Sequence, residues 1–415
     1  MRKLFVEGGH PLKGVIRVSG AKNAVLKLMA AALLGHGRFV IRNVPEIRDV
    51  FTMLGVLQAL GVEATLNDST IFLNVETVRG EAPVALVQEM RASIQVMGPL
   101  LARLGWVRLS KPGGCAIGDR PIDLHLKNFK KLGAQIREEH GFITASTNGL
   151  VGKELYLDFP SVGATENLMM AATLAQGTTV IHNAAREPEI VDIQNFINLM
   201  GARVYGAGTS TITIKGVTQL GGADYAVIPD RIEAGSYLIA AAITRGAITI
   251  EHVIPQHLTA IVDKLQETGT EIKVGTDTIA VRGVQDLFPI NILTQPYPGF
   301  ATDLQPQYMA LMTLAGGSSV IKETVYTNRF RQVEELRRMG ADILLDSNAA
   351  VIKGVPQLSS ALVHATDLRA GAALVLAGLA ASGITEITGL DHIDRGYEKL
   401  VHKLQTVGGR IWRED

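Results

Sequence analysis

The chain has 415 residues, of which 47% are apolar, and its 40 basic and 40 acidic side chains cancel to a formal net charge of zero. This length and apolar content are typical of two or three globular domains and exclude an intrinsically disordered chain. The balanced charge gives no overall field that would favour nucleic acid or an anionic membrane, so any anion site has to be built locally.

The single cysteine excludes an intrachain disulfide, and Glu7 interrupts the N-terminus before any signal-like apolar run develops. These features predict a cytoplasmic protein. The longest apolar stretches, near 234–244 and 370–384, are too short and too rich in glycine or polar residues for a membrane span of about 20 residues. We expect no span and interpret both stretches as buried helices.

One pattern recurs along the chain: an apolar helix ends in a glycine and a short strand follows. The six glycines are Gly61, Gly133, Gly201, Gly269, Gly340 and Gly408, which lie 72, 68, 68, 71 and 68 residues apart. Glycine just past a helix end adopts a left-handed backbone that other residues reach only at a cost. A second strand recurs after the other helix of each repeat, near 39–44, 106–109, 179–183, 248–253, 319–323 and 385–388.

Each repeat of roughly 70 residues therefore holds two helices and about four strands, a βαβαββ-type unit. A lone repeat cannot bury both its helices and its sheet, so several have to pack around shared helices. Helices such as 24–34 and 370–381 are apolar on nearly every side and belong inside. The predicted fold is α/β with two domains of three repeats each, 22–229 and 230–415, the second completed by residues 1–21.

The first helix of each repeat opens on polar residues. These openings are 20–23, 89–93, 161–165, 229–233, 301–305 and 366–369. Because helix N-termini attract phosphates and carboxylates, six such ends facing one interdomain cleft would suit a highly anionic substrate. Asp230 with Glu233 also fits a capping box, and Asp367 fits a cap. Asp303 fits either a simple cap or a chemical role, carried by the rigid loop 296–302.

The segment 111–121 holds two prolines, three glycines and the only cysteine, Cys115. This composition excludes a helix and predicts an exposed, mobile loop. Lys111 and Arg120 on either side favour the thiolate, whereas a buried, inert cysteine is the alternative interpretation. No Walker, dinucleotide or paired-cysteine motif appears, and no H-E-x-x-H sequence, so we expect neither metal nor cofactor. The low aromatic content of 5% argues against nucleic-acid stacking.

Several motifs together resemble the UDP-N-acetylglucosamine 1-carboxyvinyltransferase family. They are 19–24, 112–118, 120–125, 186–190, 229–233, 302–303 and 392–398, and the resemblance spans the chain in order. It implies two inside-out α/β barrel domains joined by a two-stranded crossing. It also implies transfer of the enolpyruvyl group of phosphoenolpyruvate to the 3-hydroxyl of UDP-N-acetylglucosamine, the first committed step of peptidoglycan synthesis. No obligate protein partner is implied.

Residue by residue, the resemblance implies that Cys115 is the general acid and Asp303 the base. The implied phosphoenolpyruvate clamp is Lys22, Asn23, Arg120 and Arg395. The implied nucleotide-sugar residues are Arg91, Arg120, Pro121, Ile122, Asp123, Leu124, Ser161, Val162, Gly163 and Val325, with Arg329 and Arg369 as supporting arginines. Some members carry a basic residue where this chain has Phe159-Pro160, so backbone contacts to the diphosphate are expected there.

Two alternatives stay open. The sister enzyme that acts on shikimate 3-phosphate shares the fold, although the Cys115 loop argues against it. A catalytically silent repeat scaffold that binds a sugar nucleotide would also explain the repeats.

Overall fold

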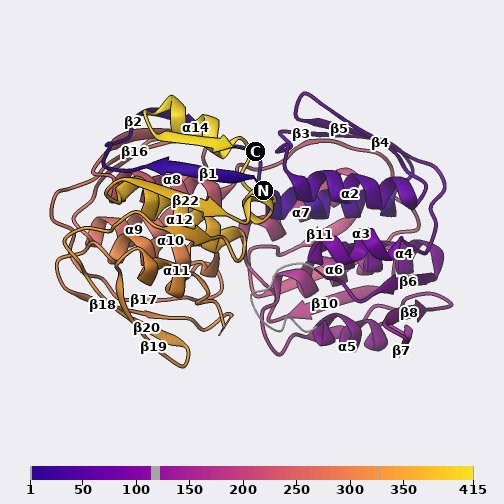
Figure 1. Cartoon of the computed structure of the whole chain (residues 1–415). Coiled ribbons are helices and arrows are strands. Elements are labelled where there is room, and N and C mark those ends of the chain that lie inside the picture. The colour runs from indigo at the N-terminus through magenta and orange to yellow at the C-terminus, as the bar shows by residue number, and fades with distance from the viewer. Residues whose placement is uncertain (1, 114–121, 327, 415) are drawn as a thin grey trace. The chain divides into compact units, whose positions relative to one another are not determined.

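The computed structural model describes residues 2–113, 122–326 and 328–414. These residues form two compact units: an N-terminal unit within 20–228, and a C-terminal unit within 229–415 that also includes the described part of 1–19. The buried apolar side chains form two separate clusters, one in each unit. In Figure 1 the indigo strand β1 (Lys3–Glu7) lies beside the yellow end of the chain, because the first residues complete the last sheet.

The N-terminal unit holds the first three repeats. Its helices are α1 (Lys22–Ala31), η1 (Ala32–Leu34), α2 (Arg48–Ala59), α3 (Val84–Glu89), η2 (Arg91–Val96), α4 (Met97–Leu104), α5 (Asp123–Lys131), α6 (Val162–Ala172) and α7 (Pro188–Leu199). Its strands are β3 (Gly37–Arg42), β4 (Glu63–Asn67), β5 (Thr70–Val75), β6 (Trp106–Ser110), β7 (Gln135–Glu139), β8 (Phe142–Ser146), β9 (Glu154–Tyr156), β10 (Thr178–His182), β11 (Arg203–Tyr205), β12 (Thr211–Lys215) and β13 (Asp224–Ala226).

The C-terminal unit holds the other three repeats. Its helices are α8 (Arg231–Ile243), η3 (Pro255–Leu258), α9 (Thr259–Glu267), η4 (Thr302–Leu304), α10 (Gln305–Met312), α11 (Gln332–Arg338), α12 (Leu368–Ala380), α13 (Leu390–Ile393) and α14 (Leu400–Thr406). Its strands are β1, β2 (Lys13–Arg17), β14 (Ala247–Glu251), β15 (Glu271–Val274), β16 (Thr278–Arg282), β17 (Ile292–Leu293), β18 (Ser318–Lys322), β19 (Asp342–Asp346), β20 (Ala349–Lys353), β21 (Leu362–His364), β22 (Ile384–Thr388) and β23 (Arg410–Glu414).

Each repeat builds one small sheet with the same strand order. Among the described residues, the four-stranded sheets run β13-β3-β5-β4, β11-β12-β10-β9, β15-β16-β14-β2, β17-β18-β20-β19 and β21-β22-β1-β23. In each of them one edge strand is parallel to its neighbour and the remaining pairings are antiparallel. The second repeat departs from this pattern: its sheet β6-β8-β7 has three strands, and the fourth position is reduced to one parallel bridge between Glu81 and Arg108.

Two of the parallel edge strands, β2 and β13, pair with strands that are distant in the sequence. Strand β2 precedes α1 in the chain but pairs with β14, so that Val15 lies opposite Thr249. Strand β13 follows the third repeat but pairs with β3, with Tyr225 opposite Ile41. Strand β1 inserts between β22 and β23. Each unit is therefore completed by a segment that is distant in sequence.

The glycines that end the repeated helices have the backbone that the sequence predicts. The φ angles of Gly61, Gly133, Gly201, Gly269, Gly340 and Gly408 are 97°, 102°, 107°, 89°, 91° and 88°. All six lie in the left-handed region, where glycine avoids the steric cost that a Cβ atom brings. The repeat is confirmed, and the glycine at each of its six positions is explained by this local requirement.

Gly201→Ala is expected to lower the free energy of unfolding by about 1 kcal/mol, because alanine is strained at positive φ. A steric clash would not cause this loss, since the nearest neighbour of the new Cβ atom would be a Leu220 methyl group at 4.0 Å. Denaturant unfolding measures it. The matched control is Gly221→Ala, which meets nothing within 4 Å and does not have a positive φ. Equal losses in both variants would contradict this explanation.

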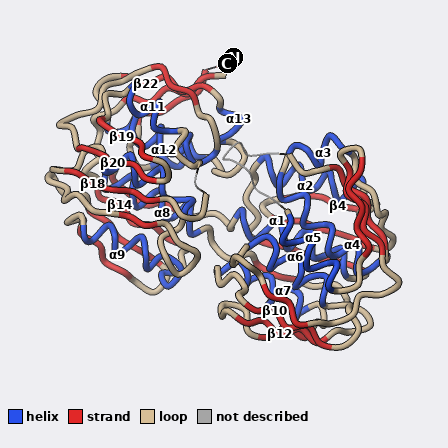
Figure 2. The backbone as a smooth tube through the Cα atoms, turned by 90° about the horizontal axis from the view of Figure 1, so that it is seen from below, coloured by secondary structure: helices blue, strands red, loops and turns tan. Residues whose placement is uncertain are grey.

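The apolar helices lie inside the sheets, as predicted. Helices α8, α10 and α12 contact one another in the C-terminal unit, and α12 is buried from Leu368 to Leu379. In Figure 2 strands such as β14 and β18 lie outside α8 and α12. Sheets on the outside and helices at the centre make up the inside-out barrel that the family resemblance implies. The α/β prediction is therefore confirmed.

The second repeat corrects one expectation. The sequence predicts that its first helix opens near 89–93, but α3 ends at Glu89, η2 follows as a 3-10 helix, and an α-helix begins only at Met97. Pro99 has no N–H for the carbonyl four residues earlier. The Asn167 side chain donates to the carbonyl of Ile94 at 2.9 Å and accepts from the backbone N–H of Gly98 at 2.8 Å. Asn167 thus replaces local helical bonds, which no local pattern reveals.

Candidate functional site

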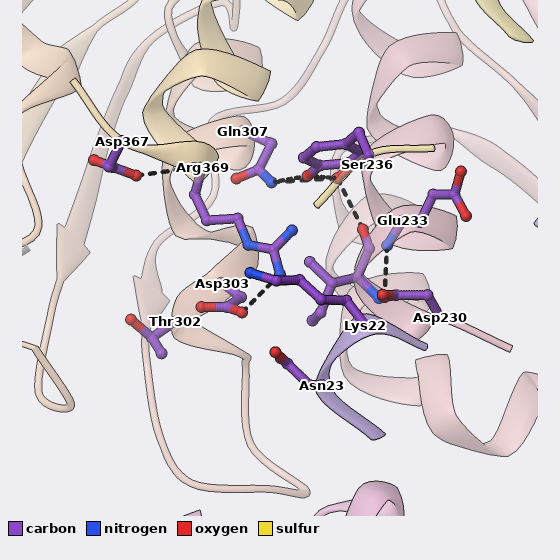
Figure 3. A network of polar contacts seen from close by, with 12 residues as sticks. Lys22, Asn23, Asp230, Glu233, Ser236, Thr302, Asp303, Gln307, Asp367 and Arg369 are labelled. Carbon is purple, nitrogen blue, oxygen red and sulfur yellow. Dashed lines mark hydrogen bonds and ion pairs between the residues drawn. The ribbon is translucent and has the colours of Figure 1, made fainter. Parts of the chain in front are cut away.

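A partly buried carboxylate in the C-terminal unit is held by two buried arginines. Arg329 Nη1 lies 2.7 Å from Asp303 Oδ1. Arg369 Nη2 donates to Asp303 Oδ2 at 2.9 Å, as Figure 3 shows. The arginine side chains are each 4% exposed, and the aspartate side chain is 24% exposed. Each carboxylate oxygen therefore has its own guanidinium, and the most accessible member of the group is the carboxylate.

The arginines decide the charge of Asp303. Burial by itself would raise the pKa of Asp303, but the charges of Arg369 and Arg329, with their hydrogen bonds, outweigh burial and hold this pKa well below its usual range. Asp303 is therefore ionised at every pH near neutrality. A carboxylate with such a low pKa is a weak base, so in this arrangement Asp303 accepts a proton poorly.

Neighbouring residues fix both arginines. Asp367 caps α12, its Oδ1 accepting from the backbone N–H groups of Arg369 at 2.8 Å and Ala370 at 3.0 Å. Arg329 Nη1 also donates to Thr302 Oγ1 at 2.9 Å. Asp303 itself makes no cap bond at η4. The interpretation of Asp303 as a simple helix cap is therefore wrong. The interpretation of Asp367 as a helix cap is confirmed.

Glu323 organises the segment that carries Val325. This fully buried carboxylate accepts at Oε1 from Thr294 Oγ1 at 2.7 Å and from the backbone N–H groups of Val325 at 2.8 Å and Tyr326 at 3.0 Å. Its Oε2 accepts from Thr302 Oγ1 at 2.9 Å. Sequence reasoning missed Glu323, which directly follows the half-buried strand β18.

Tyr397 ties the segment after α13 to the central helices. Its hydroxyl lies 2.8 Å from Ser236 Oγ, and Gln307 Nε2 donates to Tyr397 Oη at 3.0 Å. The Arg369 guanidinium lies over the Tyr397 ring, 5.5 Å from its centroid. Arg395 lies two residues earlier, between α13 and α14. The structure thus anchors the predicted Arg395 segment beside the Arg369 group.

The start of α8 corrects a second expectation. Asp230 caps the helix, accepting from the N–H groups of Ile232 at 2.8 Å and Glu233 at 3.0 Å (Figure 3). The reciprocal bond of a capping box does not form, because Glu233 accepts instead from Ser19 N–H at 2.8 Å and Lys403 Nζ at 2.6 Å. The Glu233 carboxylate is therefore paired with Lys403, which is distant in sequence, and not with the start of its own helix.

In the N-terminal unit, Lys22 and Asn23 open α1. Lys22 Nζ lies 2.9 Å from Asp49 Oδ2, and both side chains are largely buried. Asp49 belongs to the first turn of α2. The sequence did not single out this aspartate, because an acid at the start of a helix has an ordinary explanation in the helix dipole.

The predicted nucleotide-sugar residues of this unit lie mainly at helix starts. Ser161 caps α6, accepting from Ala164 N–H at 3.3 Å, with Val162 and Gly163 following in the first turn. Ile122, Asp123 and Leu124 lie at the start of α5, and Arg91 opens η2. Ser161 N–H donates to the carbonyl of Phe159 at 2.7 Å. That backbone groups of Phe159-Pro160 contact the diphosphate, in place of the basic residue that some family members carry there, stays a prediction.

His125 connects two of these helix starts. Burial, aided by the charge of Arg91, lowers the pKa of His125 to about 3, so the ring is neutral. It accepts at Nδ1 from Asn167 Nδ2 at 3.1 Å. A neutral histidine therefore joins α5 to α6 beside Arg91.

Cys115, Arg120 and Pro121 lie outside the described residues. Within the described ranges, no group of three or more histidine, cysteine, aspartate or glutamate residues is placed to hold a metal ion. None of the helices in those ranges is long and apolar enough to cross a bilayer.

Comparison with known proteins identifies the family. The family of EPSP synthase (3-phosphoshikimate 1-carboxyvinyltransferase) matches residues 6–404. UDP-N-acetylglucosamine 1-carboxyvinyltransferase 1 of Caldanaerobacter subterraneus is 52% identical over 99% of both chains. Two proteins of Carboxydothermus hydrogenoformans, UDP-N-acetylglucosamine 1-carboxyvinyltransferases 1 and 2, are each 54% identical over 100% of this chain and 98% and 99% of their own lengths.

Solved structures agree with this assignment. The enolpyruvyl transferase NikO from Streptomyces tendae superimposes with a TM-score of 0.90 at 26% identity, covering 99% of this chain and 98% of its own. EPSP synthase from Acinetobacter baumannii shares the fold, with a TM-score of 0.77, 17% identity and full coverage of both chains. The chain belongs to the enolpyruvyl transferases and, within them, to the UDP-N-acetylglucosamine 1-carboxyvinyltransferase family.

Proposed function

We propose that this chain transfers the enolpyruvyl group of phosphoenolpyruvate to the 3-hydroxyl of UDP-N-acetylglucosamine and releases phosphate, the first committed step of peptidoglycan synthesis. The observation that carries the proposal is Asp303, a partly accessible carboxylate between two buried arginines, in a chain that relatives of this name match end to end. The cytoplasmic location expected from the sequence is part of the same proposal.

The reaction balances as an addition followed by an elimination. The sugar oxygen bonds to C2 of phosphoenolpyruvate while C3 gains a proton and the hydroxyl loses one. In the second step C3 loses a proton and the C2–O bond to phosphate breaks, which leaves an enol ether and inorganic phosphate. The chemistry requires an acid near C3, a base near the sugar hydroxyl, and cations around the phosphate.

Each requirement has a proposed residue. Cys115 supplies the proton to C3, and Asp303 accepts the hydroxyl proton. Lys22, Asn23, Arg120 and Arg395 bind phosphoenolpyruvate. The sugar nucleotide contacts Arg91, Arg120, Pro121, Ile122, Asp123, Leu124, Ser161, Val162, Gly163 and Val325. Arg329 and Arg369 hold Asp303 in place. Ordinary side-chain chemistry fulfils all three requirements.

The two arginines limit when Asp303 can act as a base. A carboxylate whose pKa is held well below its usual range accepts a proton poorly. A bound anion that drew one guanidinium away from Asp303 would raise that pKa, since opposite charges are what lower it. We infer that substrate binding exchanges part of the Arg329 and Arg369 contacts from Asp303 to substrate anions, and that Asp303 gains basicity only then.

The acceptor distinguishes this proposal from its alternatives. Phosphate release from phosphoenolpyruvate is measured with UDP-N-acetylglucosamine, with shikimate 3-phosphate, and with neither. We expect release only with the sugar nucleotide. Release driven by shikimate 3-phosphate would favour the sister reaction. Binding of UDP-N-acetylglucosamine without any release, by folded protein, would favour the silent scaffold and refute the proposal.

A further inference from the structure

Lys27 places an ammonium group inside the N-terminal unit, directly behind Lys22 and Asn23. Its side chain is only 11% exposed, and its Nζ donates to the backbone carbonyl of Asn23 at 2.5 Å. Lys22 and Asn23 form the start of α1, where the proposed function places phosphoenolpyruvate. Burying a lysine ammonium costs free energy unless hydrogen-bond or ionic partners compensate, so the partners of Lys27 indicate its role.

The acidic neighbour of Lys27, Glu166, lies at ion-pair distance only. Glu166 Oε2 lies 3.6 Å from Lys27 Nζ, which is longer than a hydrogen bond, and Glu166 is fully buried. Burial raises the pKa of Glu166 to about 8. Lys27 lowers this pKa, whereas Glu189 and Glu187 raise it. Burial thus favours the neutral form of Glu166 near neutral pH, and the backbone carbonyl of Asn23 is the partner that Lys27 Nζ contacts at hydrogen-bond distance.

Glu166 also joins Lys27 to the start of α6. Gln95 Nε2 donates to Glu166 Oε2 at 3.3 Å and to the carbonyl of Gly163 at 3.1 Å. Gly163 belongs to the proposed nucleotide-sugar segment. Lys27, Glu166 and Gln95 therefore form one buried chain of contacts between the first turns of α1 and α6, both in the N-terminal unit.

We propose that Lys27 is a positioning residue for phosphoenolpyruvate. Its ammonium fixes the backbone of the first turn of α1 through Asn23, and its charge adds a positive potential behind the residues that bind the anion. The low dielectric of the interior strengthens that potential. Second-layer contacts of this kind hold binding residues in their working geometry. This inference rests on the proposed function and extends it to a residue that does not touch substrate.

The test separates phosphoenolpyruvate binding from stability. Lys27→Met removes the charge and the donor, and we expect the KM for phosphoenolpyruvate to rise about tenfold, with kcat and the KM for UDP-N-acetylglucosamine changed less than about threefold. Lys27→Gln keeps a neutral donor and is expected to raise the same KM less, which also provides a second variant should the methionine variant not fold. Glu166→Gln keeps the ammonium and should leave that KM within about twofold.

Arg103→Met is the matched structural control. Arg103 donates to the carbonyls of Leu33 at 2.9 Å and Gly35 at 2.7 Å in the same unit, at the other end of the first helix. Its loss should lower Tm and leave both KM values unchanged. The proposal is overturned when Lys27→Met behaves in the same way, or when it raises the two KM values equally.

An inactive wild-type chain would refute the proposed function rather than the role of Lys27. Titration calorimetry with inorganic phosphate then decides the second question alone. Weaker phosphate binding in Lys27→Met than in the wild type supports the inference, and equal binding overturns it.

Discussion

Asp303→Asn is expected to lower kcat by about 10³-fold, because an amide cannot accept the proton of the attacking hydroxyl. The same change leaves Arg329 and Arg369, both almost fully buried, without a carboxylate between them. Breaking such a buried pair costs about 3 kcal/mol of unfolding free energy. Sugar-nucleotide-dependent phosphate release measures the first effect, and denaturant unfolding measures the second.

Two further variants separate catalysis from stability at this position. Asp303→Glu keeps the negative charge but shifts the carboxylate by about 1 Å, and such a displacement costs about 10²-fold in rate while sparing most of the stability. Glu334→Gln breaks the surface pair with Arg337, at 2.5 Å, and should change neither quantity. An Asp303→Asn variant that stays folded and keeps kcat within tenfold would show that Asp303 is not the base.

The second large effect is expected at Lys22. Lys22→Met removes a buried ammonium from the start of α1 and should lower kcat/KM for phosphoenolpyruvate by about 10² to 10³-fold, the usual range for losing one charge-stabilising group. The KM for UDP-N-acetylglucosamine should stay within about threefold, because Lys22 is assigned to the other substrate. Steady-state kinetics with each substrate varied in turn measures both values.

Lys127→Met is the control for a lost cation in the same unit. Lys127 pairs with Asp158 at 2.5 Å on the exposed face of α5, and no role is proposed for either residue. Its kinetics should match the wild type. Lys22→Arg keeps the charge and should recover part of the lost kcat/KM. Equal losses of affinity for both substrates in Lys22→Met would contradict the assignment and indicate a general distortion around Asp49.

The repeat architecture was predictable because its signal is local. A glycine past a helix end is required by the conformation of that one residue, and Gly61 to Gly408 show it at positions that recur along the chain. The polar starts of the first helices were equally visible. The helix predicted to open within 89–93 begins at Arg91, but as a 3-10 helix that becomes an α-helix only at Met97. That difference was not predictable, since Asn167, which replaces helical bonds there, lies more than 70 residues away in sequence.

The ionic contacts of the candidate site could not be predicted in this way. Arg369 lies 66 residues from Asp303, and no periodicity predicts that the two pair. The helix opening 366–369 included Arg369, and the family resemblance pointed to both arginines, but neither signal indicated that they hold the pKa of Asp303 down. Asp49, Glu323 and Lys27 were missed because an isolated charge in a helix or after a strand is usually solvated. Only tertiary packing shows that these three are buried and bonded.

The most direct test of the account is the identity of the product. The wild-type chain is incubated with UDP-N-acetylglucosamine and phosphoenolpyruvate labelled with ¹³C at C3, and the product is analysed by mass spectrometry and NMR. The account predicts a labelled enol ether at the sugar 3-oxygen and one phosphate for each ether formed. Phosphate released together with labelled pyruvate, and no ether, would contradict it.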